Sequence, residues 1–130
     1  MSSRILFISG SPEDALRLTE MLHALPIQVQ HAKSLRRART HLQQEHFDVI
    51  LTESAVADGG WLDVLHLARE CPREIQVIVT DPQADGRFWA EALNLGAYDL
   101  LAQPFYEPEV RRILYNACTR FAHPMTMNAT

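Results

Sequence analysis

The chain has 130 residues, of which 47% are hydrophobic and 22% are charged, and its formal net charge is −4. These values are typical of one globular domain, and a negative charge without a run of lysines argues against a nucleic-acid or membrane-docking surface. The two cysteines, Cys71 and Cys118, lack the spacing of a metal knuckle and are too few for a disulfide framework. No signal peptide or long apolar span precedes the first strand, so a reduced, cytoplasmic protein is expected.

The first elements are marked by apolar runs and by a helix cap. The short apolar run from Ile5 to Ile8 predicts a buried strand. Ser11 then stands as a helix N-cap, with Pro12 in the first helical position and acidic residues in the first turn. Ile27 and Val29 alternate with glutamines, which predicts an edge strand that is covered on one face.

The second helix should begin after the N-cap Ser34, and it carries three arginines between its apolar positions. Arg36, Arg37 and Arg39 form the tightest basic group in the chain. They are compatible with contact to an acidic partner, whereas a solvated helix face is the ordinary explanation for such charges.

The third strand is the centre of the predicted fold. Val49, Ile50 and Leu51 form a short apolar run that suits a strand buried on both faces of a parallel sheet. The strand ends at Thr52-Glu53, so a carboxylate lies at its carboxyl end, where ligands collect in open α/β sheets. A loop of small residues follows and closes with Asp58-Gly59-Gly60.

The second half of the chain continues this alternation. In chain order, we expect a helix over 61–69 and a strand over 75–79, then a helix that is capped by Asp85 and runs through Leu95. A strand over 99–102 and a last helix after Pro108 should follow. Leu62, Leu95 and Phe121 each fall in the predicted buried stripe of one of these helices. Residues 1–122 should form the domain and residues 123–130 a flexible tail.

Five strands alternating with five helices form a βα repeat, which predicts an α/β fold with a single parallel sheet. Right-handed crossovers and helices on both faces favour a doubly wound, flavodoxin-like sheet of strand order 2-1-3-4-5. In this order the first and third strands are neighbours. Four strand ends, at Ser9-Gly10, Thr52-Glu53, Thr80 and Gln103, would then share one crevice.

On these features the sequence resembles the receiver domains of bacterial two-component response regulators over roughly Arg4 to Phe121. The resemblance rests on the succession of elements, on SPEDALRL in the first helix, on VIVT before the fourth loop and most specifically on LGAYDLLAQPF. It implies a signalling domain of a two-component or phosphorelay system that is not an enzyme.

The resemblance also implies a site. A working receiver has acidic residues after strand 1 that hold Mg²⁺, a phosphoryl-accepting aspartate after strand 3, a Thr or Ser after strand 4, a lysine before the proline that follows strand 5, and an aromatic switch residue in strand 5. Here Ser9 and Gly10 stand at the positions of the acidic residues, and Glu53 stands at that of the accepting aspartate. Thr80 stands at the hydroxyl position, Gln103 at the lysine position and Leu100 at the switch position. Of these, Thr80 keeps the family's residue, so we expect a degenerate phosphorylation site with no metal and no cofactor.

Two further expectations concern the crevice. Glu53 would either hydrogen-bond to Thr80 and hold the domain in an activated-like state, or be a solvated carboxylate at the crevice mouth. The resemblance also implies a cis peptide bond between Gln103 and Pro104, where receivers turn sharply.

The leading functional hypothesis is a phosphorylation-independent module for protein–protein interaction. Its protein partner would contact the surface of the fourth helix, fifth strand and fifth helix, which should carry Trp89, Leu93, Leu100, Arg111 and Arg112. Trp89 would be either an exposed interface residue or packed under its helix. A homodimer is left open, and neither nucleic acid nor a membrane is expected as a partner.

Two alternatives remain open. The turn Ser9-Gly10-Ser11 precedes a helix N-terminus and would suit a small-ligand or anion-binding domain, although Glu13 and Asp14 oppose an anion there. The other alternative is a phospho-accepting, Mg²⁺-dependent receiver in which Asp81 or Asp58 rebuilds a metal site with Glu53.

Overall fold

The structure is a computed structural model, and it describes residues 2–119. Five parallel strands form one sheet in the order β2-β1-β3-β6-β7, which confirms the predicted 2-1-3-4-5 arrangement. From one edge to the other, the strands are β2 (Ile27–Ala32), β1 (Ser3–Ile8), β3 (Val49–Glu53), β6 (Gln76–Asp81) and β7 (Asp99–Ala102).

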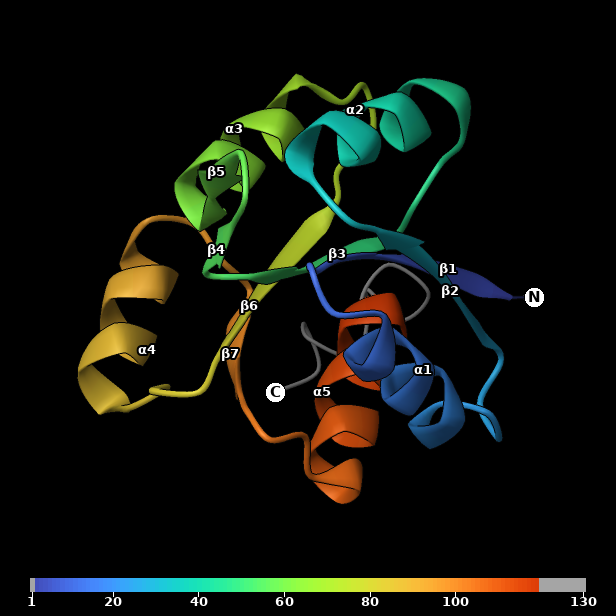
Figure 1. The fold of residues 1–130 in the computed structure, drawn as a ribbon, viewed down its shortest axis with the longest axis vertical. Helices are drawn as coiled ribbons and strands as arrows, with labels where there is room; N and C mark the ends of the chain where they lie inside the picture. The colour runs from blue at the N-terminus through green and yellow to red at the C-terminus, as the bar shows by residue number, and fades with distance from the viewer. Residues whose placement is uncertain (1, 120–130) are drawn as a thin grey trace, which may run out of the picture.

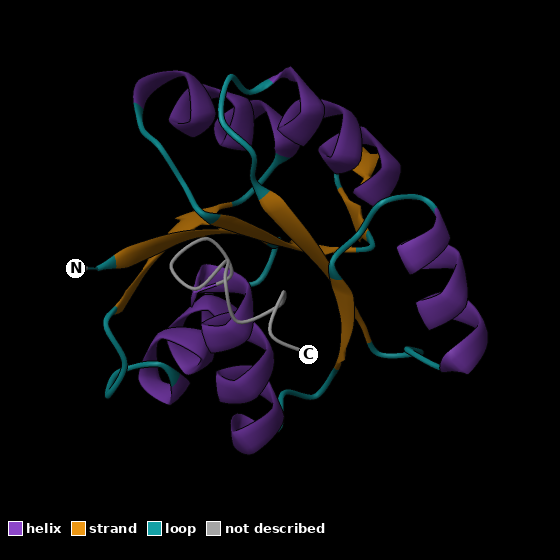
Figure 2. Ribbon diagram, turned by 180° about the vertical axis from the view of Figure 1, so that it is seen from behind, coloured by secondary structure: helices purple, strands orange, loops and turns teal. Residues whose placement is uncertain are grey.

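Helices cover both faces of this sheet (Figure 1, Figure 2). α1 and α5 lie on one face, α2 and α3 lie on the other, and α4 lies beside β7. Ser11, Ser34 and Asp85 cap α1, α2 and α4 as predicted, because each side chain accepts a hydrogen bond from the first helical turn. The helices are α1 (Pro12–Met21), α2 (Leu35–Gln44), α3 (Trp61–Glu70), α4 (Gly86–Asn94) and α5 (Glu107–Thr119).

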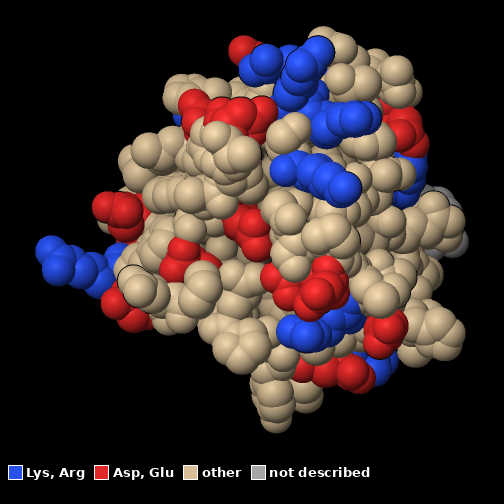
Figure 3. All heavy atoms as spheres, in the orientation of Figure 1, with Lys and Arg blue, Asp and Glu red and all other residues tan. Residues whose placement is uncertain are grey.

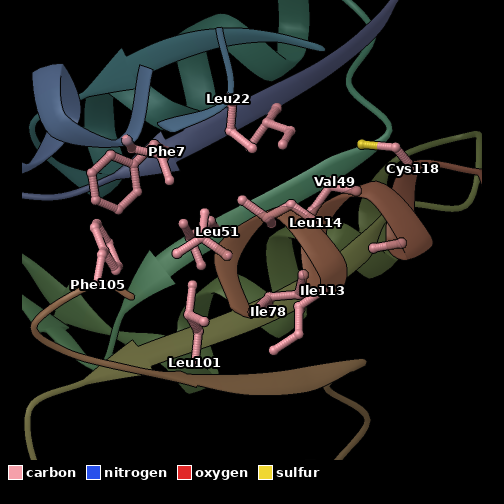
Figure 4. Close-up of a cluster of buried hydrophobic side chains, with 14 of the residues drawn as sticks. Phe7, Leu22, Val49, Leu51, Ile78, Leu101, Phe105, Ile113, Leu114 and Cys118 are labelled. Atoms are coloured by element: carbon pink, nitrogen blue, oxygen red, sulfur yellow. The ribbon is translucent and has the colours of Figure 1, made fainter. Parts of the chain in front are cut away.

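The central strands send alternate side chains into two apolar layers, as the pleat of a strand requires. Phe7 and Leu51 pack with Leu114 of α5 on one face (Figure 4). Ile8 and Ile50 pack against α2 and α3 on the other face. A smaller cluster beneath α4 consists of Val79, Ala92, Ala97 and Leu100. Burial on both faces explains why these strands are continuous apolar runs in the sequence.

The loop after β3 contains a short antiparallel hairpin that the sequence did not predict. It consists of β4 (Ala55–Val56) and β5 (Gly59–Gly60). A side chain on Gly59 would collide with Leu35, since an added Cβ would lie 2.2 Å from Leu35 Cδ1. Glycine therefore lets the hairpin approach the start of α2. Strands of two residues are too short to show a sequence period.

Some helix ends differ from the predicted stripes. Leu62 and Leu95 are 49% and 43% exposed, so placing them in the core was wrong. Leu62 lies in the first turn of α3 and Leu95 is the C-cap of α4, where the side chains project beyond the covered surface. Phe121 and the predicted tail 123–130 lie outside the described residues. Within residues 2–119, no helix has both the length and the apolar character of a membrane span.

Leu114→Ala should lower the free energy of unfolding by about 2–5 kcal/mol, because the fully buried side chain would leave a cavity. Urea unfolding followed by circular dichroism measures the change. Leu16→Ala is the matched control, since Leu16 on α1 is 62% exposed. Its effect should stay within about 0.5 kcal/mol. Equal losses in the two variants would contradict this description of the core.

Candidate functional site

The sequence-predicted site positions meet at the carboxyl edge of the sheet. Glu53 and Thr80 are directly paired in the β3–β6 register. Ser9 and Gly10 follow β1, and the N–H of Gln103 after β7 donates to the Asp81 carbonyl at 3.2 Å. The Gln103–Pro104 peptide bond is cis, as predicted. The parallel topology therefore gathers these positions from four separate strands.

The carboxylate of Glu53 is bonded to the turn after β1. Its Oε1 accepts a hydrogen bond from Gly10 N–H at 3.1 Å. Ser9 is fully buried and its Oγ accepts from Ser11 N–H at 3.0 Å, while Ser11 Oγ accepts from Asp14 N–H at 3.1 Å. An anion at this turn would have to displace the negatively charged Glu53 from Gly10, so the geometry does not favour the anion-binding alternative.

The proposed hydrogen bond between Glu53 and Thr80 does not form. Thr80 is fully buried, and its Oγ1 donates to the Leu101 carbonyl oxygen at 2.8 Å. A buried hydroxyl needs a partner, and the neighbouring strand β7 supplies one directly. The hydroxyl therefore joins β6 to β7, and of the two interpretations of Glu53, the one that bonds it to Thr80 is not supported.

Asp81 is also engaged by groups within the protein. Its Oδ2 accepts a hydrogen bond from the Ser54 hydroxyl, and its Oδ1 accepts from Gln83 N–H at 2.7 Å. Among the described residues, no group of three or more His, Cys, Asp or Glu side chains is placed to hold a metal ion. The contacts of Asp81 give no support to a rebuilt metal site with Glu53.

Asp58 caps α2 from the β4–β5 hairpin. Its Oδ1 accepts from Leu35 N–H at 2.9 Å, and its Oδ2 accepts from Arg36 N–H at 3.1 Å. These two backbone donors lower the pKa of the Asp58 carboxyl from its usual value. The sequence left open a metal-ligand role for Asp58. It could not show the cap, because the capped helix starts more than twenty residues earlier in the chain and no local pattern connects the two.

The fourth-helix surface differs in part from the prediction. Leu100 is 7% exposed and packs with Ala92 and Ala97 under α4, so it does not belong to a partner surface. Trp89 is 48% exposed, and its Nε1 donates to Asp99 Oδ1 at 3.0 Å. Of the two interpretations of Trp89, the structure therefore supports the exposed one.

The sequence comparison shows similarity to a response regulator. No protein family model matches the chain. The response regulator protein PilR of Pseudomonas aeruginosa is 24% identical over 114 residues, which cover 88% of this chain and 26% of PilR. The chain thus spans about a quarter of the length of this relative.

Several solved receiver domains have a similar fold although their sequences differ from this chain. The signal receiver domain of a protein described as a Luxo repressor from Vibrio parahaemolyticus matches with a TM-score of 0.84 at 18% identity, over 92% of each chain. The beryllofluoride-activated NtrC4 receiver domain dimer matches with a TM-score of 0.81 at 22% identity, over 91% of this chain and 98% of that one. The chain therefore has the flavodoxin-like fold of response regulator receiver domains.

Asp58→Ala should destabilise the domain at pH 7, because two backbone N–H groups of α2 lose their carboxylate partner. The folded-state pKa of Asp58 is lowered, so its contribution is present above the unfolded-state pKa and is lost as the pH falls through the folded-state value. The difference in Tm between variant and wild type should therefore narrow as the pH is lowered from neutral.

Thermal unfolding at several pH values checks this prediction. Glu91→Gln is the control, since it removes an exposed carboxylate that makes no ion pair with residues 2–119. Its Tm should stay close to that of the wild type at each pH. A constant difference between Asp58→Ala and wild type across the pH range would show that the carboxylate charge is not involved.

Proposed function

We propose that this chain is a receiver-like signalling domain of a two-component or phosphorelay system that works as a protein–protein interaction module without being phosphorylated. The observation that carries the proposal is the hydrogen bond from Gly10 N–H to Glu53 Oε1. It joins the phosphoryl-acceptor position to the position of the missing acidic pair. The receiver fold and the similarity to PilR support the assignment to signalling.

The composition of the site supports independence from phosphorylation. Mg²⁺ requires near-octahedral oxygen ligands, usually with one or two carboxylates. Ser9 uses its buried hydroxyl to accept from Ser11, and Gly10 has no side chain. Phosphoryl transfer depends on positioning and charge neutralisation, and Gln103 is neutral where the family has lysine. Glu53 therefore lacks the groups that would stabilise the transition state.

Glu53 then has a structural role in this proposal. Through an exposed hydrogen bond to Gly10, its carboxylate would hold the β1–α1 turn against the end of β3. A hydrogen bond from a backbone N–H to a carboxylate is among the stronger hydrogen bonds in proteins. The turn would therefore keep one conformation, and the domain would present a constant surface to its partner.

Incubation with acetyl phosphate and Mg²⁺ should leave the wild-type chain unmodified in intact mass spectrometry. Glu53→Asp alone should also stay unmodified, because the acceptor would still lack metal ligands and a neutralising cation. A labile phosphoryl adduct should appear only in the combined variant Ser9→Asp, Gly10→Asp, Glu53→Asp and Gln103→Lys.

Glu91→Asp provides a remote exposed control for the glutamate-to-aspartate change. Circular dichroism with and without Mg²⁺ should show that the combined variant is folded and gains stability from the metal. A stable adduct on wild-type Glu53 would refute the proposal. Efficient labelling of Glu53→Asp alone would show that the metal argument is wrong.

The surface formed by α4, β7 and α5 is the proposed contact site for a protein partner. Trp89 and Tyr106 are 48% and 67% exposed, and Arg112 is exposed on α5. Exposed aromatic residues and arginine are enriched at protein interfaces. The NtrC4 receiver was solved as a dimer, so a second copy of this chain is one candidate partner.

Trp89→Arg should weaken self-association of the chain roughly tenfold or more, because an interface tryptophan commonly contributes over a kcal/mol. Sedimentation velocity over a range of protein concentrations measures this effect. Leu62→Ala is the control, since Leu62 is 49% exposed on α3, outside this surface. A wild-type chain that stays monomeric at every concentration would contradict the homodimer and leave a different protein as the partner.

A further inference from the structure

A cluster of positive charge surrounds the start of α2. Lys33, Arg36, Arg37 and Arg39 are all exposed, and none of them forms an ion pair within residues 2–119. They are four of the twelve Lys and Arg residues, and since the net charge is −4, the rest of the chain carries −8 without them. Figure 3 shows Lys and Arg side chains gathered in the upper part of the molecule, where Figure 1 places α2. We call these four residues the basic cluster.

Helix stability does not explain the basic cluster. Positive charges near a helix N-terminus are unfavourable, because the macrodipole is positive at that end. α1, α3 and α5 carry acidic residues in their first turns, as the dipole favours. α4 has no acidic residue in its first turn and carries Arg87 there, and α2 likewise has none and carries two arginines, Arg36 and Arg37. The arginines therefore gain nothing from the dipole of their own helix, although the charge of Arg39 contributes to lowering the pKa of the Asp58 carboxyl.

The side chains of the basic cluster, and not the helix backbone, are available to a ligand. Asp58 accepts the N–H groups of Leu35 and Arg36, and Ser34 accepts the N–H of Arg37. The guanidinium groups project from an end of the helix whose backbone donors already have partners. Each guanidinium can bind a carboxylate through two parallel hydrogen bonds.

A partly apolar groove adjoins the basic cluster between α2 and α3. It has a volume of about 400 Å³. Its apolar lining consists of Leu42, Leu67, Cys71 and Pro72, and its polar lining consists of Arg39, Gln43 and Glu70. Burial raises the pKa of the Cys71 thiol, so this side chain stays neutral and acts as an apolar wall. Arg39 belongs to both features, so a ligand in the groove would have a guanidinium directly beside it.

We propose that the basic cluster and the α2–α3 groove together form a docking surface for an acidic segment of a partner protein. An apolar side chain of that segment would enter the groove, and flanking carboxylates would bind the arginines. This surface goes beyond the interaction proposed for α4, β7 and α5, and it does not depend on the state of Glu53.

The observations favour a protein segment over nucleic acid. The apolar part of the groove, next to the arginines, matches a segment in which apolar and acidic side chains alternate. A nucleic acid would extend past the four basic residues and approach the rest of the chain, whose summed formal charge is −8. A short acidic segment would contact only the basic cluster and the groove.

Selection from a random peptide library displayed on phage tests the proposal. Peptides that bind the wild-type chain should be enriched in Asp and Glu next to aliphatic or aromatic residues. Their binding should weaken with rising salt. Replacing the apolar residues of a selected peptide by serine should also weaken its binding, because the groove would then lose its apolar occupant.

Matched variants connect this binding to the named residues. Arg36→Ala, Arg37→Ala and Arg39→Ala together should weaken the selected peptides roughly tenfold or more. Arg17→Ala and Arg87→Ala together remove exposed charges outside this surface and should change the affinity less than about twofold. Glu70→Gln, which removes the acidic group lining the groove, should tighten binding. The Trp89→Arg variant should bind the selected peptides as the wild type does. This result would distinguish the α2 surface from the surface of α4, β7 and α5.

Several results would overturn the proposal. Selected peptides without acidic residues would do so, as would no enrichment at all or equal binding to the triple arginine variant. Tighter binding of a DNA duplex or of phosphatidylserine vesicles through the same arginines would replace the protein segment by another class of partner. Self-association that the triple variant abolishes would assign the surface to a second copy of the chain.

Discussion

The fold depends on the burial of β3 on both faces of the sheet. Val49, Ile50 and Leu51 are completely buried, and a strand in this position needs helices above and below it. Parallel neighbours then require crossover connections, so the carboxyl ends of all five strands come to the same edge. Polar side chains at those ends are brought together by this constraint and not by any attraction between them. Glu53 is the last residue of β3, so it lies at this edge.

At this edge, polar groups have partners within the protein. Glu53 bonds to the turn after β1, Thr80 joins β6 to β7, and Asp81 accepts from Ser54 and from the loop before α4. Leaving a buried polar group unpaired is costly, so such contacts resist rearrangement. A site built for ligand exchange would keep donors or acceptors open, whereas these contacts join neighbouring strand ends. These contacts are consistent with the proposal that the domain presents a constant surface to its partner.

The two proposed contact surfaces differ in chemistry and position. The surface around Trp89 is aromatic and lies on α4, β7 and α5. The basic cluster lies on α2 beside a partly apolar groove. Because the two surfaces differ in chemistry, the two proposals can be tested independently of each other. The charge separation, with four exposed basic residues on an otherwise acidic chain, would orient an approaching acidic partner toward α2.

The sequence by itself determined the strand order, the caps at Ser11, Ser34 and Asp85 and the gathering of site positions. These features follow from local periodicity, cap chemistry and the rules of parallel βα topology. Only the tertiary structure decided that Thr80 turns to Leu101, that Asp58 caps α2 and that Leu100 is buried. The physical reason is that each of these outcomes depends on a neighbour brought close by folding. A side chain bonds to the nearest available partner, and nothing in the local sequence says which distant residue that will be.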